Sequence, residues 1–209
     1  MDYATLCANV QDTVENGFTD EMLALWAQQT EQKIYNLIQL PVMRKSAPVA
    51  AVSGVAQITL PTDCLFVYSL AVIDGSGAYH YLLNKDTNYV RQAYPQPTVQ
   101  GRPRVYAIAN DTTLLLGPTP DAAYAGEIEY SHYPESIVTA GETWLGDNYD
   151  SALFNGMLVE AARFLKSPKE VVDLYLKMFD EAVLGLKQLG AGKLRQDAYR
   201  SGQYREAVR

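Results

Sequence analysis

The first 40 residues repeat apolar side chains with the period of an α-helix. Over residues 3–15 they recur at i, i+3, i+4, i+7 and i+11, which predicts a short helix that Asn16-Gly17 ends. A second helix is predicted over 20–38, and Pro41 prevents its continuation. Its apolar stripe consists of Leu23, Trp26, Ala27, Thr30, Ile34, Leu37 and Ile38.

From about residue 44 to 135 the spacing changes to that of β-strands, with frequent Gly and Pro. Three hairpins are predicted, with turns at Ser53-Gly54, at 74–77 and at Asn110-Asp111, followed by a last strand over 126–133. Residues 86–93 are predicted as a short helix or an ordered loop. The β-branched and aromatic content favours a small sandwich or barrel-like sheet.

The helical period returns in the last third of the chain. One helix is predicted over 149–166, where Gly156, Ala161 and Ala162 would allow a neighbouring helix to approach closely. Ser167-Pro168-Lys169-Glu170 has the pattern of a capping box with proline in the first turn, so a second helix begins there. We expect Gly190 and Gly192 to end it.

Together these elements predict an α+β fold. Two N-terminal and two C-terminal helices form a four-helix body, which comprises residues 1–43 and 145–190. An antiparallel β module is inserted at 44–144, and residues 191–209 form an extended C-terminal arm. The arm has too few apolar side chains to fold alone.

The charge of the chain limits its function. The 209 residues carry a formal charge of −7, which argues against general adhesion to nucleic acid or to an anionic membrane. The apolar runs fall short of the roughly 18–20 residues of a membrane span, and the N-terminus is not expected to be a secretory signal. The arm, however, holds five basic and two acidic side chains, so its net charge is positive whereas that of the rest of the chain is negative.

Residues that could perform catalysis are sparse. Glu127 and Glu129 share one face of a predicted strand and could form a carboxylate pair, but we expect them to face water while Ile128 and Tyr130 point inward. His132 is expected to be a hydrogen-bonded histidine at a strand end.

The two cysteines are too few for a metal cluster or a disulfide framework. Cys7 lies on an apolar helical stripe, which favours a buried, inert thiol, and Cys64 lies in a turn with no histidine near it in sequence. Gly75-Ser76-Gly77 is a hairpin turn that lacks the other residues of a phosphate-binding loop. No catalytic site and no cofactor are therefore predicted.

The arm combines tyrosines with arginines, the residue types that contribute most binding energy at protein interfaces. Charged termini are commonly solvated, and that alternative remains open. We nevertheless predict that the arm binds another protein. The predicted contact residues are Lys193, Arg195, Tyr199, Arg200, Tyr204, Arg205 and Arg209.

Several segments, taken in order, resemble one protein family. They are the helix start at Asp2–Leu6, QITLPTDCLFVYSLAV at 57–72, GRPRVYAIANDTTLLLGPTPDAAYAGEIEYSHYPE at 101–135 and NYDSALFNGMLVEAARFLKSPKEVVDLYLKMFDEAVLGL at 148–186. The chain resembles the head-to-tail adaptor proteins of short-tailed phages, including those with the SU10-like adaptor domain. The resemblance lies in the order of its features, which are a strand, Gly-x-Pro, Pro-x-Pro-Asp and paired helices. Cys64 departs from the pattern, since such proteins often have an aromatic or aliphatic residue there.

The resemblance implies a structural role in the neck of a virion, for a protein made in the host cytoplasm. Such adaptors form a ring, usually of twelve subunits, beneath the portal protein. They join the portal to the tail nozzle and tail fibres and leave a channel through which genomic DNA passes without specific binding. Their C-terminal segments embrace the portal, a role that falls by position on residues 191–209.

Three other functions remain open at this point. A tail-tube or head-completion protein would contact the adaptor, and cross-links from Lys193 only to tail proteins would favour it. A virion-associated hydrolase would lose activity on Glu129→Gln. A DNA-binding protein would show an affinity that falls steeply with salt.

Overall fold

The computed structural model describes the backbone of residues 1–194 and the side chains of residues 1–190. The chain divides into two compact units, which are described separately below. The helical unit comprises Met1–Val42 and the chain from Pro134 onward. The β unit comprises Met43–Tyr133. The presence of helices and sheets confirms the predicted α+β class.

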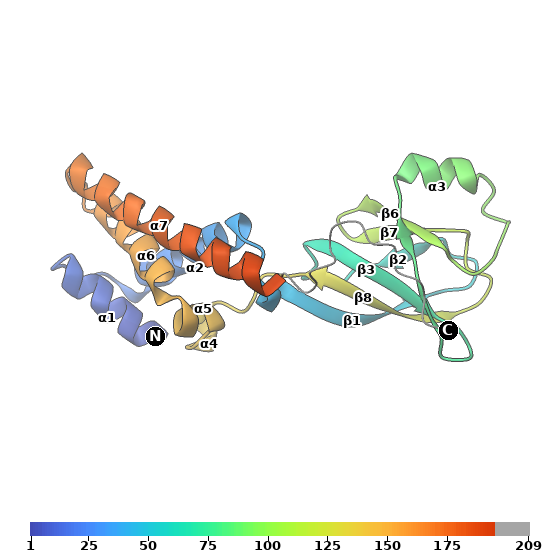
Figure 1. The fold of residues 1–209 in the computed structure, drawn as a ribbon, viewed down its shortest axis with the longest axis horizontal. Helices are drawn as coiled ribbons and strands as arrows, with labels where there is room; N and C mark the ends of the chain where they lie inside the picture. Colours follow the sequence, from blue (N-terminus) through green and yellow to red (C-terminus); the bar gives the residue numbers. More distant parts are fainter. Residues whose placement is uncertain (195–209) are drawn as a thin grey trace. The chain divides into compact units, whose positions relative to one another are not determined.

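The helical unit is built around α6 (Asp150–Phe164), which contacts three other helices of more than ten residues. These are α1 (Tyr3–Thr13), α2 (Asp20–Leu37) and α7 (Lys169–Leu194), and α6 and α7 run side by side (Figure 1). Asp2 caps α1 and Thr19 caps α2, each by accepting a hydrogen bond from a backbone N–H of the first turn. The buried side chains of α6 include Ala152, Leu153, Met157, Leu158, Ala161 and Ala162.

Gly156 lets α6 approach its neighbours closely. A Cβ atom at this position would lie 2.2 Å from Cγ2 of Thr30 on α2 and 3.0 Å from the ring of Phe179 on α7. Both neighbours are buried, so neither could move aside at little cost. Glycine is therefore required where the three helices meet.

The predicted end of the last helix is wrong. We expected Gly190 and Gly192 to stop it, but α7 continues to Leu194. A Cβ atom at Gly190 would lie 3.0 Å from the carbonyl oxygen of Gln39, so this glycine allows the helix to pack against the chain that follows α2. Its role is close approach rather than termination.

Two short helices, α4 (Ile137–Ala140) and α5 (Trp144–Asn148), complete the helical unit and were not predicted. Buried Glu31, only 4% exposed, joins α2 to α4. Its carboxylate accepts hydrogen bonds from the Ser136 hydroxyl at 2.6 Å and from the Ile137 N–H at 2.9 Å. Burial raises the pKa of Glu31 because water no longer solvates the charged form, although these two bonds partly oppose the shift.

Glu31→Gln should change how stability depends on pH. Because the pKa of Glu31 is raised in the folded state, the folded protein holds this proton to higher pH than the unfolded chain does. The contribution of Glu31 is therefore largest at low pH and is lost as pH rises through the folded-state pKa. Urea unfolding of both proteins from about pH 4 to pH 7 measures this. As pH rises over this range, the wild-type free energy of unfolding should fall relative to that of the variant. A difference between the two proteins that is constant with pH would contradict a raised pKa for Glu31.

The β unit is a sandwich of two four-stranded sheets. The first sheet has the order β1-β8-β3-β4, with β1 at Arg44–Ala51, β8 at Tyr124–Ser131, β3 at Phe66–Ile73 and β4 at Tyr79–Tyr81. The second has the order β2-β7-β6-β5, with β2 at Gln57–Thr59, β7 at Thr113–Gly117, β6 at Val105–Asn110 and β5 at Leu83–Asn84. Both sheets contribute to one core, which includes Leu70, Tyr106, Leu114, Ile128 and Tyr130.

Two features of the predicted β module are wrong. The predicted hairpin around Ser53-Gly54 does not form, because β1 pairs with β8 and β2 pairs with β7 in the other sheet. The module is also not wholly antiparallel, since β5 pairs in parallel with β6. Parallel neighbours need a long crossover, and the segment that contains α3 (Thr87–Ala93) supplies it (Figure 1). The hairpins β3–β4 and β6–β7 are confirmed.

Candidate interaction surfaces

Most of the predicted arm lies outside the described residues. This applies to Arg195, Tyr199, Arg200, Tyr204, Arg205 and Arg209. The backbone of Lys193 lies in the last turn of α7, so the helix carries the chain directly into this segment. The role of these residues as a contact stays a prediction.

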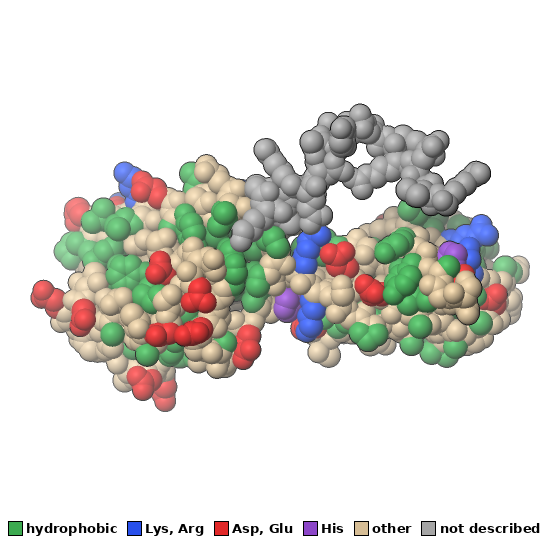
Figure 2. All heavy atoms as spheres, turned by 60° about the horizontal axis from the view of Figure 1, so that its bottom comes forward, with side chains coloured by type: hydrophobic (Ala, Val, Ile, Leu, Met, Phe, Trp, Pro, Cys, Tyr) green, Lys and Arg blue, Asp and Glu red, His purple; other side chains and the backbone are tan. Residues whose placement is uncertain are grey.

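The helical unit carries an excess of acidic side chains, as Figure 2 shows on the face in view. Residues 1–32 contain six carboxylates and no lysine or arginine. Five of the six are on the surface, at the start of α1 and around the connection from α1 to α2, and Glu31 is buried. This region would repel the phosphates of nucleic acid and attract a basic surface.

Several large apolar side chains of helix α7 are exposed to solvent. Phe179, Val183 and Leu186 face the core, whereas Leu174 is 55% exposed and Leu184 57% exposed. Met178 and Leu189 are exposed as well. Leu174, Met178 and Leu189 fall along one side of the helix, next to the buried stripe, while Leu184 lies on the side that faces away from it. Exposed apolar patches of this kind are typical of protein contacts.

Glu127 and Glu129 face outward from β8, as expected, while Ile128 and Tyr130 are buried between the sheets. The two acids have different partners. Glu129 pairs with Arg44 at 3.3 Å, and Glu127 accepts a hydrogen bond from the Tyr79 hydroxyl at 3.4 Å. This arrangement is typical of a strand face that is open to solvent. The two carboxylates do not form a pair with each other.

His132 and the two cysteines take the structural roles expected of them. Nδ1 of His132 lies 3.0 Å from the carbonyl oxygen of Met43, at the end of β8. Cys7 is buried on α1, and Cys64 is half-buried in the β unit. Burial raises the pKa of both thiols, so both are held in the unreactive protonated form.

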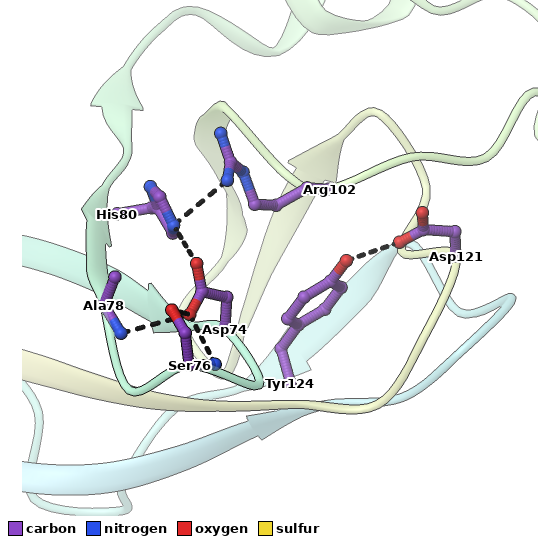
Figure 3. Close-up of polar contacts among 7 residues, drawn as sticks. All are labelled: Asp74, Ser76, Ala78, His80, Arg102, Asp121 and Tyr124. Atoms are coloured by element: carbon purple, nitrogen blue, oxygen red, sulfur yellow. Dashed lines mark hydrogen bonds and ion pairs between the residues drawn. The ribbon is translucent and has the colours of Figure 1, made fainter.

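A polar network at the tip of the β3–β4 hairpin was missed by the sequence prediction (Figure 3). Oδ1 of Asp74 accepts hydrogen bonds from the Ser76 N–H, the Ser76 hydroxyl and the Ala78 N–H, at 2.9, 2.5 and 3.1 Å. Oδ2 lies 2.7 Å from Nε2 of His80, which lies 3.0 Å from a guanidinium nitrogen of Arg102. The bonds that Asp74 accepts from Ser76, His80 and Ala78, that of the Ser76 hydroxyl first, lower the pKa of Asp74. The hairpin tip is thereby held in one conformation.

Aspartate followed by glycine and serine could have revealed the bonds inside this turn, since such residues commonly bond their own backbone. The link to Arg102 could not be inferred, because it joins the hairpin to the segment before β6. A separate bond lies beside it, from the Tyr124 hydroxyl to Asp121 at 2.6 Å (Figure 3).

Two kinds of site were searched for in the part of the chain that is described, a metal-binding cluster and a membrane-spanning helix. Histidine, cysteine and carboxylate side chains nowhere gather there in groups of three or more that could hold a metal ion. Among the described helices, none has the length and apolar character needed to cross a bilayer.

Comparison with known proteins gives a match to one family model. The model described as SU10 adaptor protein matches residues 1–206. The match spans both units and nearly all of the segment after α7. A search among curated proteins found no match.

Proposed function

Because this chain belongs to the SU10 adaptor protein family, we propose that it joins the portal of a phage head to the tail. The adaptor role and the place in the neck of the virion follow from the family, whose members are structural phage proteins. To this the proposal adds that the chain forms a ring, which binds the portal on one side and the tail nozzle and tail fibres on the other. The observation that carries it is the family match over residues 1–206.

A ring of copies is supported by the surface of α7. In a closed ring each subunit presents two different faces, one to each neighbour. The exposed Leu174, Met178 and Leu189 give the helical unit an apolar surface that a neighbouring copy can bury. We propose that the ring contains twelve copies, the usual number in the rings that such adaptors form.

Attachment to the portal is assigned to residues 191–209. This segment is basic and holds Tyr199 and Tyr204 among its arginines, whereas the helical unit is acidic. Arms projecting from one ring onto another act together, so a modest affinity for each arm gives firm attachment.

The acidic surface also suits a conduit for DNA. A wall rich in lysine would hold the phosphate backbone during ejection, whereas a negative or neutral wall would not. No catalytic role is included in the proposal, because Glu127, Glu129 and His132 are engaged in structural contacts.

Mixing the purified chain with purified portal protein tests this function. We expect the chain alone to be monomeric or weakly associated, and to form a ring when portal is added, with one adaptor for each portal subunit. Native mass spectrometry and electron microscopy measure the stoichiometry. A chain that ignores the portal but joins isolated tail proteins would favour the tail-tube or head-completion alternative.

A further inference from the structure

The β unit contains a pocket of about 360 Å³ that is separate from the surfaces described above. It lies where α3 and the segment after it meet strand β7. Val90 and Tyr94 line it on the α3 side, Leu115 and Leu116 on the β7 side, and Ala56 at one end. Its walls are therefore mainly apolar.

The pocket is formed by the fold rather than by a loose loop. Val90 is 2% exposed and packs with Val105 and Ala107 in a small core beneath α3, against which Tyr94 also rests. A Cβ atom at Gly117 would lie 2.6 Å from the Tyr94 ring, so glycine allows the ring to lie against β7.

Two prolines continue the wall beyond Tyr94. Pro95 and Pro97 both line the pocket, and each fixes its own backbone φ angle. The main-chain amide of Tyr94 is held as well, since it donates to the carbonyl oxygen of Val90 at 2.9 Å. The cavity is thus preformed and needs little reorganisation before binding.

Arg91 is the charged residue at this pocket. It is exposed on the last turn of α3, and among the side chains that the structure describes, those of residues 1–190, it has no ion pair or hydrogen-bond partner. No carboxylate lines the same pocket. A guanidinium with free donors beside apolar walls is suited to a carboxylate that lies next to an apolar group.

The surface beside the lining residues is apolar as well. Val55, which precedes Ala56, is 45% exposed, and Val99, two residues beyond Pro97, is 54% exposed. The Gly54 N–H donates to the carbonyl oxygen of Pro120, and the Gly101 N–H donates to that of Thr119, so both segments are tied to the strand connection that borders the pocket. These side chains extend the apolar surface that a bound segment would cover.

We propose that this pocket binds a segment of a partner protein in which a large apolar or aromatic side chain is followed by an aspartate or glutamate. The apolar side chain fills the cavity between Tyr94 and Leu115, and the carboxylate pairs with Arg91. The pocket has room for an aromatic side chain, and burial in an apolar cavity is how such a residue anchors an interface. This inference goes beyond the proposed function, since it identifies a partner by its chemistry and does not depend on a ring or a portal.

Capped tetrapeptides provide a direct test with the full-length chain. The probe is Ser-Trp-Asp-Ser, and the comparison peptides carry Asn or Lys in place of Asp, or Ala in place of Trp. Backbone NMR shifts of the ¹⁵N-labelled chain locate the site, and titration gives each Kd. We expect the probe to shift the amides of Val90, Tyr94 and Leu115, and to bind about tenfold more tightly than the Asn peptide, since one charged hydrogen bond is worth roughly that factor.

Arg91→Gln should remove the preference for Asp over Asn and leave the weaker binding of tryptophan in place. Arg104→Gln is the matched control, because Arg104 is also an exposed arginine of the β unit and does not line the pocket. The proposal is overturned if the probe causes no shifts around the pocket, if the Lys peptide binds as well as the Asp peptide, or if both variants lose affinity equally. None of these results bears on whether rings form on the portal, so the two proposals fail independently.

Discussion

A chain truncated after Leu194 should remain folded and lose its attachment to the portal. The cut preserves the whole of α7, whose buried residues Phe179, Val183 and Leu186 hold it in the helical unit. It removes four arginines and two tyrosines, which are all of the predicted contact residues except Lys193. Because the arms of a ring act together, the apparent affinity for portal should fall by a factor of about 100 or more.

Circular dichroism and thermal unfolding check the folded state of the truncated chain, and co-sedimentation with portal measures attachment. A chain with residues 195–209 in scrambled order is the control, since it keeps the charge and the length. If the scrambled chain binds portal normally, the contact depends on charge alone. If the truncated chain itself still decorates portal, another surface makes the attachment and the assignment of the arm is wrong.

Gly156→Val should destabilise the helical unit by about 3 kcal/mol, near the upper end of the usual cost of overpacking a core. The new Cβ would overlap Cγ2 of Thr30, at 2.2 Å, and press on the Phe179 ring at 3.0 Å. Since Thr30 is 1% exposed and branched at Cβ, the clash must be relieved by moving α2 or α7 away from α6. That movement would also change the exposed face of α7.

Urea unfolding measures the loss of stability. Gly75→Val is the matched control, because a Cβ atom there meets nothing within 4 Å. It should cost less than about 0.5 kcal/mol, as is usual for a surface substitution. Equal losses in the two variants would mean that the three helices do not pack as closely at Gly156 as the structure shows.

The sequence predicts the elements of this fold better than their pairing. The long helices, the hairpins β3–β4 and β6–β7, and the start of α7 after Pro168 depend on local patterns of apolar side chains and turn residues. The partners of β1 and β2 depend on which sheet each strand joins, and alternation along a strand does not encode that. Gly190 was misread for a similar reason, because only the packed structure shows the Gln39 carbonyl that it must clear.

The candidate contacts divide in the same way. Outward-facing Glu127 and Glu129 follow from the alternation of β8, and that prediction is confirmed. The pocket beside Arg91 could not be predicted, since it is assembled from α3, its proline-containing extension and a strand about 20 residues further along the chain. In the sequence, Arg91 is one of 17 basic residues and has nothing to distinguish it.

The way in which β1 and β8 pair has a consequence for how such proteins diversify. Arg44, the first residue of β1, lies opposite Ser131, the last residue of β8, so the chain enters and leaves the β unit at adjacent points. An insert whose ends meet can be lengthened, recombined or replaced without altering the scaffold that hosts it. Exchange of residues 43–133 between relatives would then change the surface that the β unit presents while the helical unit stays the same.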